Sequence, residues 1–171
     1  MPQNIEIKAR IRDLAELLRR VAATGAQGPQ TLVQTDTFYR CPGRGRLKLR
    51  EMRGQPPELI LYLRPDGKDP KACQYIRLPL ADVRHARAIL AATHGRIGIV
   101  RKIRKLYLHN RVRIHVDRVR GLGNYLELEV LLTGGRTPAA GRRIARDLMK
   151  RLGVRQADLI RDAYIDMLRR V

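Results

Sequence analysis

The sequence predicts an α+β protein built on a small, closed antiparallel β-barrel whose charged face points inward and whose apolar face is covered by helices. One observation is that many segments alternate apolar and polar residues with period two, as half-buried strands do. Another is that their polar faces carry both signs of charge, densely and in strand after strand. An open sheet with its polar face in water would also explain the alternation. However, there are too few predicted helices to protect the edges of a wide flat sheet, and closure into a barrel removes those edges.

The predicted strands follow this alternation along the chain. In the first, Ile5, Ile7 and Ala9 alternate with polar and charged residues. The same pattern recurs over residues 46–50, 58–64, 111–117 and 125–130. Less regular alternation predicts further strands at about 31–40, 72–79 and 97–108. Gly121 to Asn124 is predicted to be a hairpin connection, because its spacing matches neither a P-loop nor a dinucleotide fingerprint.

Helical periodicity interrupts the strands at four places. Apolar residues at i, i+3, i+4 and i+7 from Leu14 predict an amphipathic helix, and a second helix is expected over residues 82–92. Thr137 and Pro138 are typical of an N-cap and a first helical turn, and Gly153 of a left-handed stop, so a third helix lies between them. The tail over residues 158–168 has a weaker apolar stripe and is also predicted to be helical.

Length and composition favour one cytoplasmic domain over residues 1–171. The two cysteines, Cys41 and Cys73, are far apart and suggest neither a disulfide scaffold nor a zinc site. The N-terminal residues are charged throughout and no apolar run approaches a membrane span, so we expect neither secretion nor membrane insertion. A homodimer remains compatible with the sequence.

The formal net charge of +20, from 36 basic and 16 acidic residues, predicts an anionic partner. Nucleotides, polyphosphate, nucleic acid and an acidic membrane surface would all satisfy the sign of this charge, and coding bias toward arginine is a further explanation of it. The chain has one Phe, six Tyr and no Trp, so it is poor in the stacking residues that single-strand binders use.

If the charged face is the interior, its groups must be paired or bound to a ligand, because an isolated buried charge costs several kcal/mol. Arg and Lys suit phosphate oxygens, whereas clustered carboxylates suit a hard cation such as Mg²⁺ or Mn²⁺. The basic candidates at inward positions are Lys8, Lys48, Arg50, Arg64, Lys71, Lys102, Arg104 and Arg113. The acidic candidates are Glu6, Asp117, Glu127 and Glu129. His115 shares this face and is expected to be a hydrogen-bonded structural histidine.

Short motifs also stand in a fixed order over most of the chain. They are Asn4-Ile5-Glu6-Ile7-Lys8, Gln34-Thr35-Asp36-Thr37-Phe38-Tyr39, Gly45-Arg46-Leu47-Lys48-Leu49-Arg50-Glu51, Arg64-Pro65-Asp66, Arg101-Lys102-Ile103-Arg104, Arg113-Ile114-His115-Val116-Asp117, Gly121-Leu122-Gly123, Leu126-Glu127-Leu128-Glu129 and Tyr164-Ile165-Asp166-Met167-Leu168. Each is weak alone, but the ordered set is specific. In this set the chain resembles the CYTH superfamily, the triphosphate tunnel metalloenzymes, which includes class IV adenylyl cyclases, thiamine triphosphatases and inorganic triphosphatases.

The resemblance implies an eight-stranded tunnel in which Lys and Arg hold a triphosphate and carboxylates hold a metal ion. Carried over residue by residue, Glu6, Glu127 and Glu129 would be metal ligands and Asp117 a further acidic contributor. Lys8 would match the lysine of the opening motif.

The chain departs from the family pattern at several positions. Asn4 stands where the opening motif has its first Glu, and Leu63 where an acidic residue is common. Arg118 and Arg120 stand where relatives often carry acidic residues. These changes add positive charge and would weaken metal binding or alter the choice of metal.

Three functions are compatible with this sequence. The first is a metal-dependent hydrolase of inorganic, thiamine or nucleoside triphosphate. The second is a class IV adenylyl cyclase that converts ATP to cyclic AMP and pyrophosphate. The third is a noncatalytic binder of polyphosphate or RNA, which the net charge and the departures from the acidic pattern favour. Base-recognition residues and a dedicated general base are not evident, and we place hydrolysis slightly ahead of cyclisation.

Overall fold

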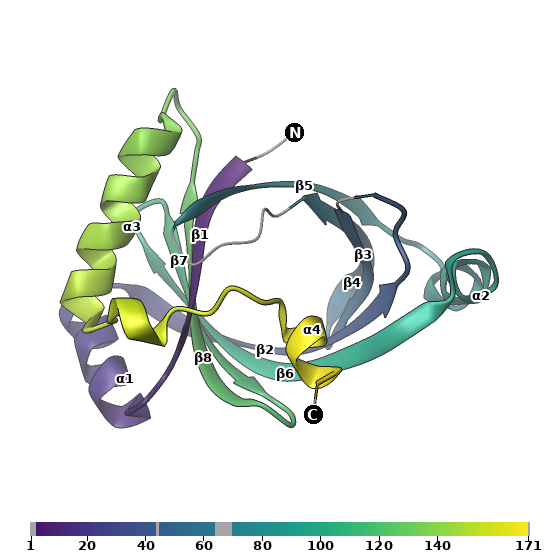
Figure 1. Ribbon diagram of the computed structural model, residues 1–171, viewed down its shortest axis with the longest axis horizontal. Helices are drawn as coiled ribbons and strands as arrows, with labels where there is room; N and C mark the ends of the chain where they lie inside the picture. The colour runs from purple at the N-terminus through teal and green to yellow at the C-terminus, as the bar shows by residue number, and fades with distance from the viewer. Residues whose placement is uncertain (1–2, 44, 64–69, 171) are drawn as a thin grey trace.

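The computed structural model describes residues 3–43, 45–63 and 70–170 of the chain. Within these residues, eight antiparallel strands close into a barrel with the order β1-β5-β4-β3-β2-β6-β7-β8 (Figure 1). The strands are β1 (Gln3–Arg10), β2 (Gln27–Tyr39), β3 (Gly45–Met52), β4 (Gln55–Leu63), β5 (Lys71–Pro79), β6 (Arg96–His109), β7 (Val112–Val119) and β8 (Gly123–Leu131). The predicted closed barrel with flanking helices is therefore confirmed.

Four α-helices and one 3₁₀ turn accompany the barrel within the described residues, and the first three helices lie close to their predicted positions. They are α1 (Leu14–Ala23), α2 (Val83–His94), α3 (Pro138–Leu152), the single 3₁₀ turn η1 (Gln156–Asp158) and α4 (Tyr164–Leu168). Thr137 caps α3 by accepting a hydrogen bond from the Ala140 amide, and Gly153 ends it with φ 71°. Between β7 and β8, Gly121 and Gly123 have positive φ, which confirms the predicted hairpin connection.

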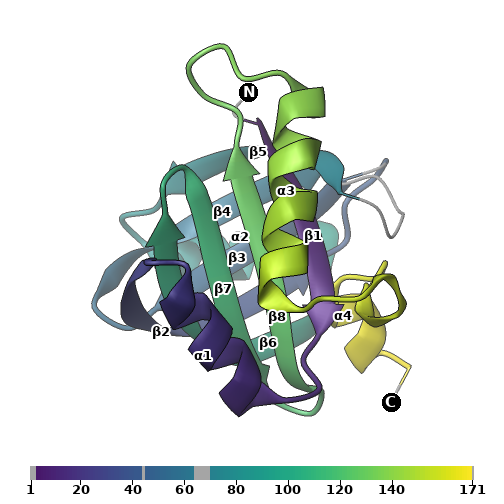
Figure 2. The same cartoon turned by 90° about the vertical axis from the view of Figure 1, so that its left-hand side faces the viewer.

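Two helices cover one side of the barrel. Helix α3 packs along β1 and β8, and α1 lies beside it over β7 and β8 (Figure 2). The largest apolar cluster fills the space between these helices and the outward faces of the three strands, and includes the fully buried Ile5, Ile114 and Leu128. This packing buries the apolar side of the alternation and turns the charged side into the lumen.

The rest of the outer surface departs from the prediction, because helices cover only part of the apolar face. Val33 and Ile103 lie opposite each other on β2 and β6 and are 49% and 45% exposed. On β4 and β5 the exposed residues include Ile76 and Leu78, which are 49% and 55% exposed. Helix α2 covers only a small region, where Leu90 packs on the outward faces of β2 and β3. Helices α1 and α3 cover one side and α2 covers a small region elsewhere, so together they do not reach around the barrel.

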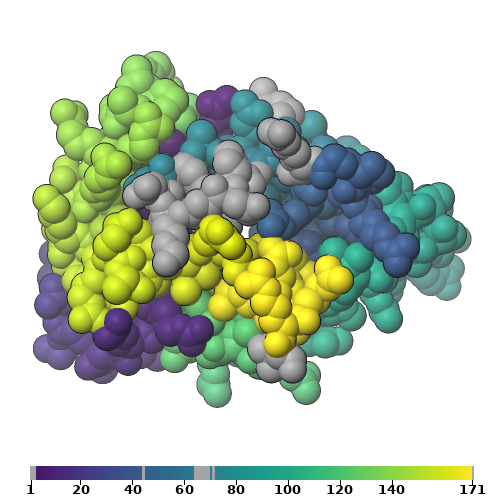
Figure 3. Space-filling model, in the orientation of Figure 1, coloured from purple at the N-terminus to yellow at the C-terminus, as the bar shows by residue number. Residues whose placement is uncertain are grey.

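The C-terminal segment crosses one mouth of the barrel (Figures 1 and 3). Leu159 pairs with Ala9, and the Ile160 amide donates to the Lys8 carbonyl oxygen, so this segment adds to the end of β1. The predicted helix over 158–168 is wrong in its first half, because these backbone groups bond to β1 instead of forming a helix. Only α4 is helical. No helix in the described ranges is long and apolar enough to cross a membrane.

Candidate functional site

The lumen of the barrel holds a cavity of about 320 Å³. Its walls carry side chains from all eight strands, together with Ala163 and Tyr164 of the C-terminal segment. Inward positions repeat every second residue, for example Asn4, Glu6 and Lys8 on β1. The parity read from the sequence is therefore confirmed.

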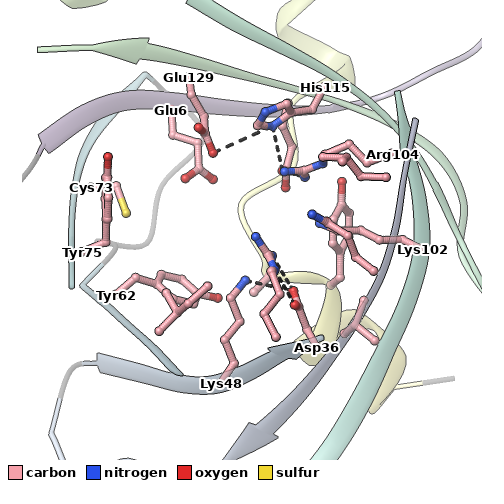
Figure 4. A pocket seen from close by; sticks show the side chains of 18 of the residues that line it. Glu6, Asp36, Lys48, Tyr62, Cys73, Tyr75, Lys102, Arg104, His115 and Glu129 are labelled. Carbon is pink, nitrogen blue, oxygen red and sulfur yellow. Dashed lines mark hydrogen bonds and ion pairs between the residues drawn. The ribbon is translucent and has the colours of Figure 1, made fainter. Parts of the chain in front are cut away.

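Asp36 and two cations form the first ionic group of the lumen (Figure 4). Arg50 on β3 makes a two-pronged contact with Asp36 on β2, with Nε–Oδ1 and Nη2–Oδ2 distances of 2.7 Å. The Lys48 ammonium lies 3.0 Å from Asp36 Oδ2. Burial alone would raise the pKa of Asp36, but Arg50 and Lys48 hold it well below its usual value. Burial and the nearby Arg50 lower the pKa of Lys48 to about 8.

A second ionic group lies on β6, β7 and β8. Arg104 binds Asp117 through two hydrogen bonds of 2.6 Å and also contacts Glu127. Lys102 approaches the same Asp117 at 3.3 Å, and Lys8 lies 3.2 Å from Glu127. Burial opposes ionisation of Glu127, yet Lys8 and Arg104 keep its pKa well below its usual value. Both carboxylates are therefore charged and hold their cations in fixed positions.

Tyr164 brings the C-terminal segment into this second group. Its hydroxyl donates to Asp117 at 3.1 Å, and its ring lies under the Lys8 ammonium, 3.9 Å from the ring centroid. Burial, Glu127 and Asp117 raise the pKa of Tyr164, so the phenol stays protonated and acts as a donor.

A third group contains His115 and the carboxylates of β8. The His115 Nδ1 atom lies 3.8 Å from Glu129 and 3.9 Å from Glu127, and it has no hydrogen-bond partner among the described residues. Burial and the charge of Arg104 lower the pKa of His115, which favours the neutral imidazole. Arg113 approaches Glu129 at 3.5 Å. His115 is buried as expected of a structural histidine, but the expected hydrogen bond is not found at Nδ1 among the described residues.

The predicted phosphate-binding residues mostly converge. Six of them line the cavity, namely Lys8, Lys48, Arg50, Lys102, Arg104 and Arg113. Arg64 lies outside the described residues, as does the side chain of Lys71, the first residue of β5. Arg77 of β5 also lines the cavity, although the sequence analysis did not select it.

The predicted acidic residues separate into two kinds. Glu6, Glu127 and Glu129 line the cavity. Asp117 does not, because it lies behind Arg104 and Lys102 with no exposed surface. Its oxygens are occupied by these two cations and by Tyr164, so its position differs from that expected of a metal ligand.

Two residues of the site, Asp36 and Tyr164, have roles that were not predicted from the sequence. Asp36 lies in one of the sequence motifs, and its inward position on the strand could have indicated a role as partner to the lumen cations. Tyr164 enters the lumen from outside the strands, where alternation gives no information.

The chemistry of the donor set fits a hard cation. Glu6 and Glu129 are direct partners on neighbouring strands and point into the same part of the cavity (Figure 4). Two carboxylates placed directly opposite each other repel, and a cation between them would remove that repulsion. Over the described ranges, no three His, Cys, Asp or Glu side chains are already gathered as a metal site. The two glutamates could therefore supply only part of a coordination shell, which phosphate oxygens and water would have to complete.

Comparison with known proteins agrees with this geometry. A family model, the CYTH domain, matches residues 2–164. A protein of Methanocaldococcus jannaschii that is provisionally named an adenylate cyclase is 23% identical over 171 residues, covering 95% of this chain and 97% of that protein. A solved structure from Pyrococcus horikoshii has a TM-score of 0.86 at 23% identity, covering 95% of this chain and 98% of that one. A Hippeastrum protein, provisionally named an adenylyl cyclase and described as having a dominant triphosphatase activity, has a TM-score of 0.66 at 13% identity and covers 99% and 96% of the two chains.

Proposed function

The chain belongs to the CYTH domain family, and from this membership and the lumen's charges we propose that it is an enzyme that hydrolyses a triphosphate inside the barrel. The observation that carries the proposal is the excess of cations in one enclosed cavity. Lys and Arg side chains that line it outnumber the Asp and Glu side chains. Buried cations need counter-charges, and a triphosphate supplies several of them in one compact ligand.

The cations of the lumen are held in place before any ligand arrives. Asp36 orients Arg50 and Lys48 from one side of the cavity. Asp117 and Glu127 orient Arg104, Lys102 and Lys8 from other strands. Phosphoryl transfer requires mainly positioning and charge neutralisation, and fixed cations provide both without reorganisation during the reaction. We assign Asp117 this positioning role in place of metal ligation.

A divalent cation, Mg²⁺ or Mn²⁺, would be held by Glu6 and Glu129, with Glu127 beside them. When bound, it would neutralise charge that develops on the phosphate oxygens. The neutral side chain of Asn4, which stands where the family pattern has a further Glu, leaves this site with fewer charged ligands and predicts weaker metal affinity.

A cyclase is the second candidate, and one observation favours it. The side-chain oxygens of Asn4 and Gln34 are buried in the lumen and have no hydrogen-bond partner among the described residues. An unpaired buried acceptor costs free energy. A nucleobase whose amino group donated a hydrogen bond to one of these amide oxygens would remove that cost. The relative from Methanocaldococcus jannaschii carries an adenylate cyclase name. Hydrolysis stays the first candidate because it requires no recognition of a nucleobase.

The reaction is tested with purified protein, Mg²⁺ or Mn²⁺, and three substrates: ATP, thiamine triphosphate and inorganic triphosphate. Phosphate release supports the hydrolase, whereas cyclic AMP with pyrophosphate supports the cyclase. Absence of turnover on all three, together with salt-sensitive RNA binding, would favour a noncatalytic polyanion binder.

The metal assignment has its own test in the variants E6Q and E129Q. Each removes one negative charge from the cross-strand pair, so we expect the Mn²⁺ affinity to fall at least tenfold and turnover to need correspondingly more metal. Mn²⁺ binding is measured by electron paramagnetic resonance in the presence of tripolyphosphate. The control is E16Q, which makes the same change on α1, where Glu16 pairs with Arg19 and Arg20. Unchanged Mn²⁺ affinity in both lumen variants would show that these glutamates are not ligands.

A further inference from the structure

A second cluster of cations lies outside the barrel, in a cleft of about 510 Å³ between α2 and the outer faces of β2, β3 and β6. Figure 1 shows α2 at the end of the barrel away from α1 and α3. The polar residues that line this cleft are Thr35, Thr37, Tyr39, Glu51, Arg87, Arg96 and Arg101. The alternation of β2 separates the cleft from the lumen, because Asp36 and Phe38 point inward between these outward residues.

The floor of the cleft carries an unused hydrogen-bonding group. Tyr39 is only 1% exposed, and its hydroxyl has no partner among the residues that the structure describes. An unpaired buried hydroxyl is costly, so such a group usually marks a position where a ligand or water binds. Burial raises the pKa of Tyr39, while the positive charges of Arg87 and Arg96 act in the opposite direction. These two guanidinium groups therefore lie within electrostatic reach of the phenol.

Two arginines, Arg87 and Arg96, lie within electrostatic reach of this hydroxyl, and Arg101 lines the same cleft farther along β6. Arg87 of α2 is paired with Glu51 at 2.7 Å. Arg96 and Arg101 of β6 form no ion pair with any carboxylate in the described part of the chain. Their positive charge is therefore not neutralised within the cleft.

A β-bulge places one of these arginines. The register of β2 against β6 shifts between Phe38, which pairs with Gly98, and Tyr39, which pairs with Arg96. Without the extra residue, Ile97 would lie opposite Tyr39 on the outer face. Bulges re-aim side chains in this way, so the irregular strand puts a guanidinium beside the phenol in place of an apolar group.

We propose that this cleft is a second phosphate-binding site, outside the tunnel, in which Tyr39, Arg96 and Arg101 bind the terminal phosphoryl group of a small anion such as pyrophosphate. Arginine forks and hydroxyl donors match the oxygens of a phosphoryl group. The Tyr39 hydroxyl is buried beneath the cleft, so we expect a compact terminal group to approach it more readily than the diester backbone of a nucleic acid. Thr35 and Thr37 add hydroxyl groups along the same strand.

The test is a titration of metal-free protein with pyrophosphate at physiological ionic strength, followed by backbone amide signals in nuclear magnetic resonance. Amides of α2, such as those of Arg87 and Ala91, report on the outer cleft, whereas those of Glu127 and Glu129 on β8 report on the tunnel. In Y39F, which removes only the hydroxyl, we expect the α2 response to need about tenfold more pyrophosphate, because one hydrogen bond to a charged group is lost. The β8 response should be unchanged.

A matched pair of charge variants separates a site from general attraction to a basic protein. R101A removes an arginine of the cleft, and R146A removes an exposed arginine of α3, on the other side of the barrel. We expect R101A to weaken the α2 response at least tenfold and R146A to leave it nearly unchanged. Equal weakening by the two variants, an unaltered response in Y39F, or no α2 response in the wild-type protein would overturn the proposal.

Discussion

Asp36 contacts two buried cations that differ in how readily they lose a proton. Its carboxylate contacts both Lys48 and Arg50, and these three side chains are each nearly or fully enclosed. The contact raises the pKa of Lys48, but burial and Arg50 outweigh it and leave that pKa at about 8. Arg50 remains charged at every accessible pH. Of the two cations beside Asp36, Lys48 can therefore lose its proton near pH 8, whereas Arg50 cannot.

This difference predicts a pH dependence of triphosphate binding. Below pH 8 Lys48 is charged, and above it the amine becomes neutral, so affinity for tripolyphosphate should fall as the pH rises through about 8 and beyond. The affinity is measured by calorimetry without metal between pH 6.5 and 9.5, which brackets this value by about 1.5 units on each side. In K48R the fall over this window should be lost, because arginine keeps its charge. The same fall in both proteins would assign it to another group.

The same pKa shift has a consequence for stability with a definite sign. Between the folded value of about 8 and the usual value of 10.5, the unfolded chain binds more protons at Lys48 than the folded chain. Unfolding free energy therefore rises with pH over this interval through this group. The unliganded protein carries a cost at neutral pH that a bound polyanion would offset.

At the level of elements, the C-terminal segment behaves as part of the site. It extends β1 through the bond from the Ile160 amide to Lys8, and the Lys8 ammonium donates in turn to the Asp162 carbonyl oxygen at 3.3 Å. Tyr164 then reaches Asp117, on which Arg104 and Lys102 converge. A short segment is thus coupled to cations from two different strands.

Variants of Tyr164 test this coupling. Y164F removes the hydrogen bond to Asp117 and keeps the ring under Lys8, so we expect a loss of about 1 kcal/mol in unfolding free energy. Y164A also removes the ring and should cost about 3 kcal/mol or more. Hydrogen exchange at the Ile160 amide is the local measurement, because release of the segment breaks its bond to Lys8. Protection of that amide in Y164A equal to wild type would show that Tyr164 does not hold the segment on β1.

Strand β2 illustrates how one element serves two surfaces. Asp36 and Phe38 face the lumen, whereas Thr35, Thr37 and Tyr39 face the outer cleft. Because successive side chains of a strand point to opposite faces, the two sets are adjacent in sequence but face different surfaces. Substitutions on one set can therefore be made without removing a side chain from the other.

Across the whole molecule, the net charge of +20 combines charges buried in the lumen with charges exposed to solvent. Lys8, Lys102 and Arg104 of the lumen are buried beside carboxylates, whereas many arginines elsewhere, such as Arg143 and Arg146 on α3, are exposed. Salt screens exposed charges strongly and buried charges much less. The protein should therefore have two kinds of anion binding that differ in salt dependence.

Raising salt should separate these two kinds. Between 50 and 200 mM salt, any RNA binding through surface arginines should fall by about 10³-fold. Tripolyphosphate bound in the lumen should lose much less affinity over the same range. Fluorescence anisotropy for RNA and calorimetry for tripolyphosphate provide the comparison, with R143A/R146A expected to weaken RNA binding alone. Equally steep slopes for the two ligands would place tripolyphosphate on the outer surface.

The sequence predicted the lumen better than it predicted the roles within it. Alternation identifies which residues of a strand share a face, so the inward placement of Lys48, Arg50 and Glu129 could be read directly. It does not say which strand lies next to which, and the pairing of Asp36 with Arg50 depends on β2 and β3 being neighbours in register. The exposure of Val33 and Ile103 was missed for the same reason, because helix docking depends on the closed shape.

By itself, the sequence determined the approximate positions of the strands and of the first three helices, the inward face of the strands and the family motifs, because these depend on local geometry and on the order of residues. Only the tertiary structure decided that Asp117 lies behind the cations, that Tyr164 enters the lumen and that a bulge brings Arg96 to Tyr39. These contacts join residues far apart in the chain or depend on a register shift. Their formation rests on how the barrel closes, which no local pattern specifies.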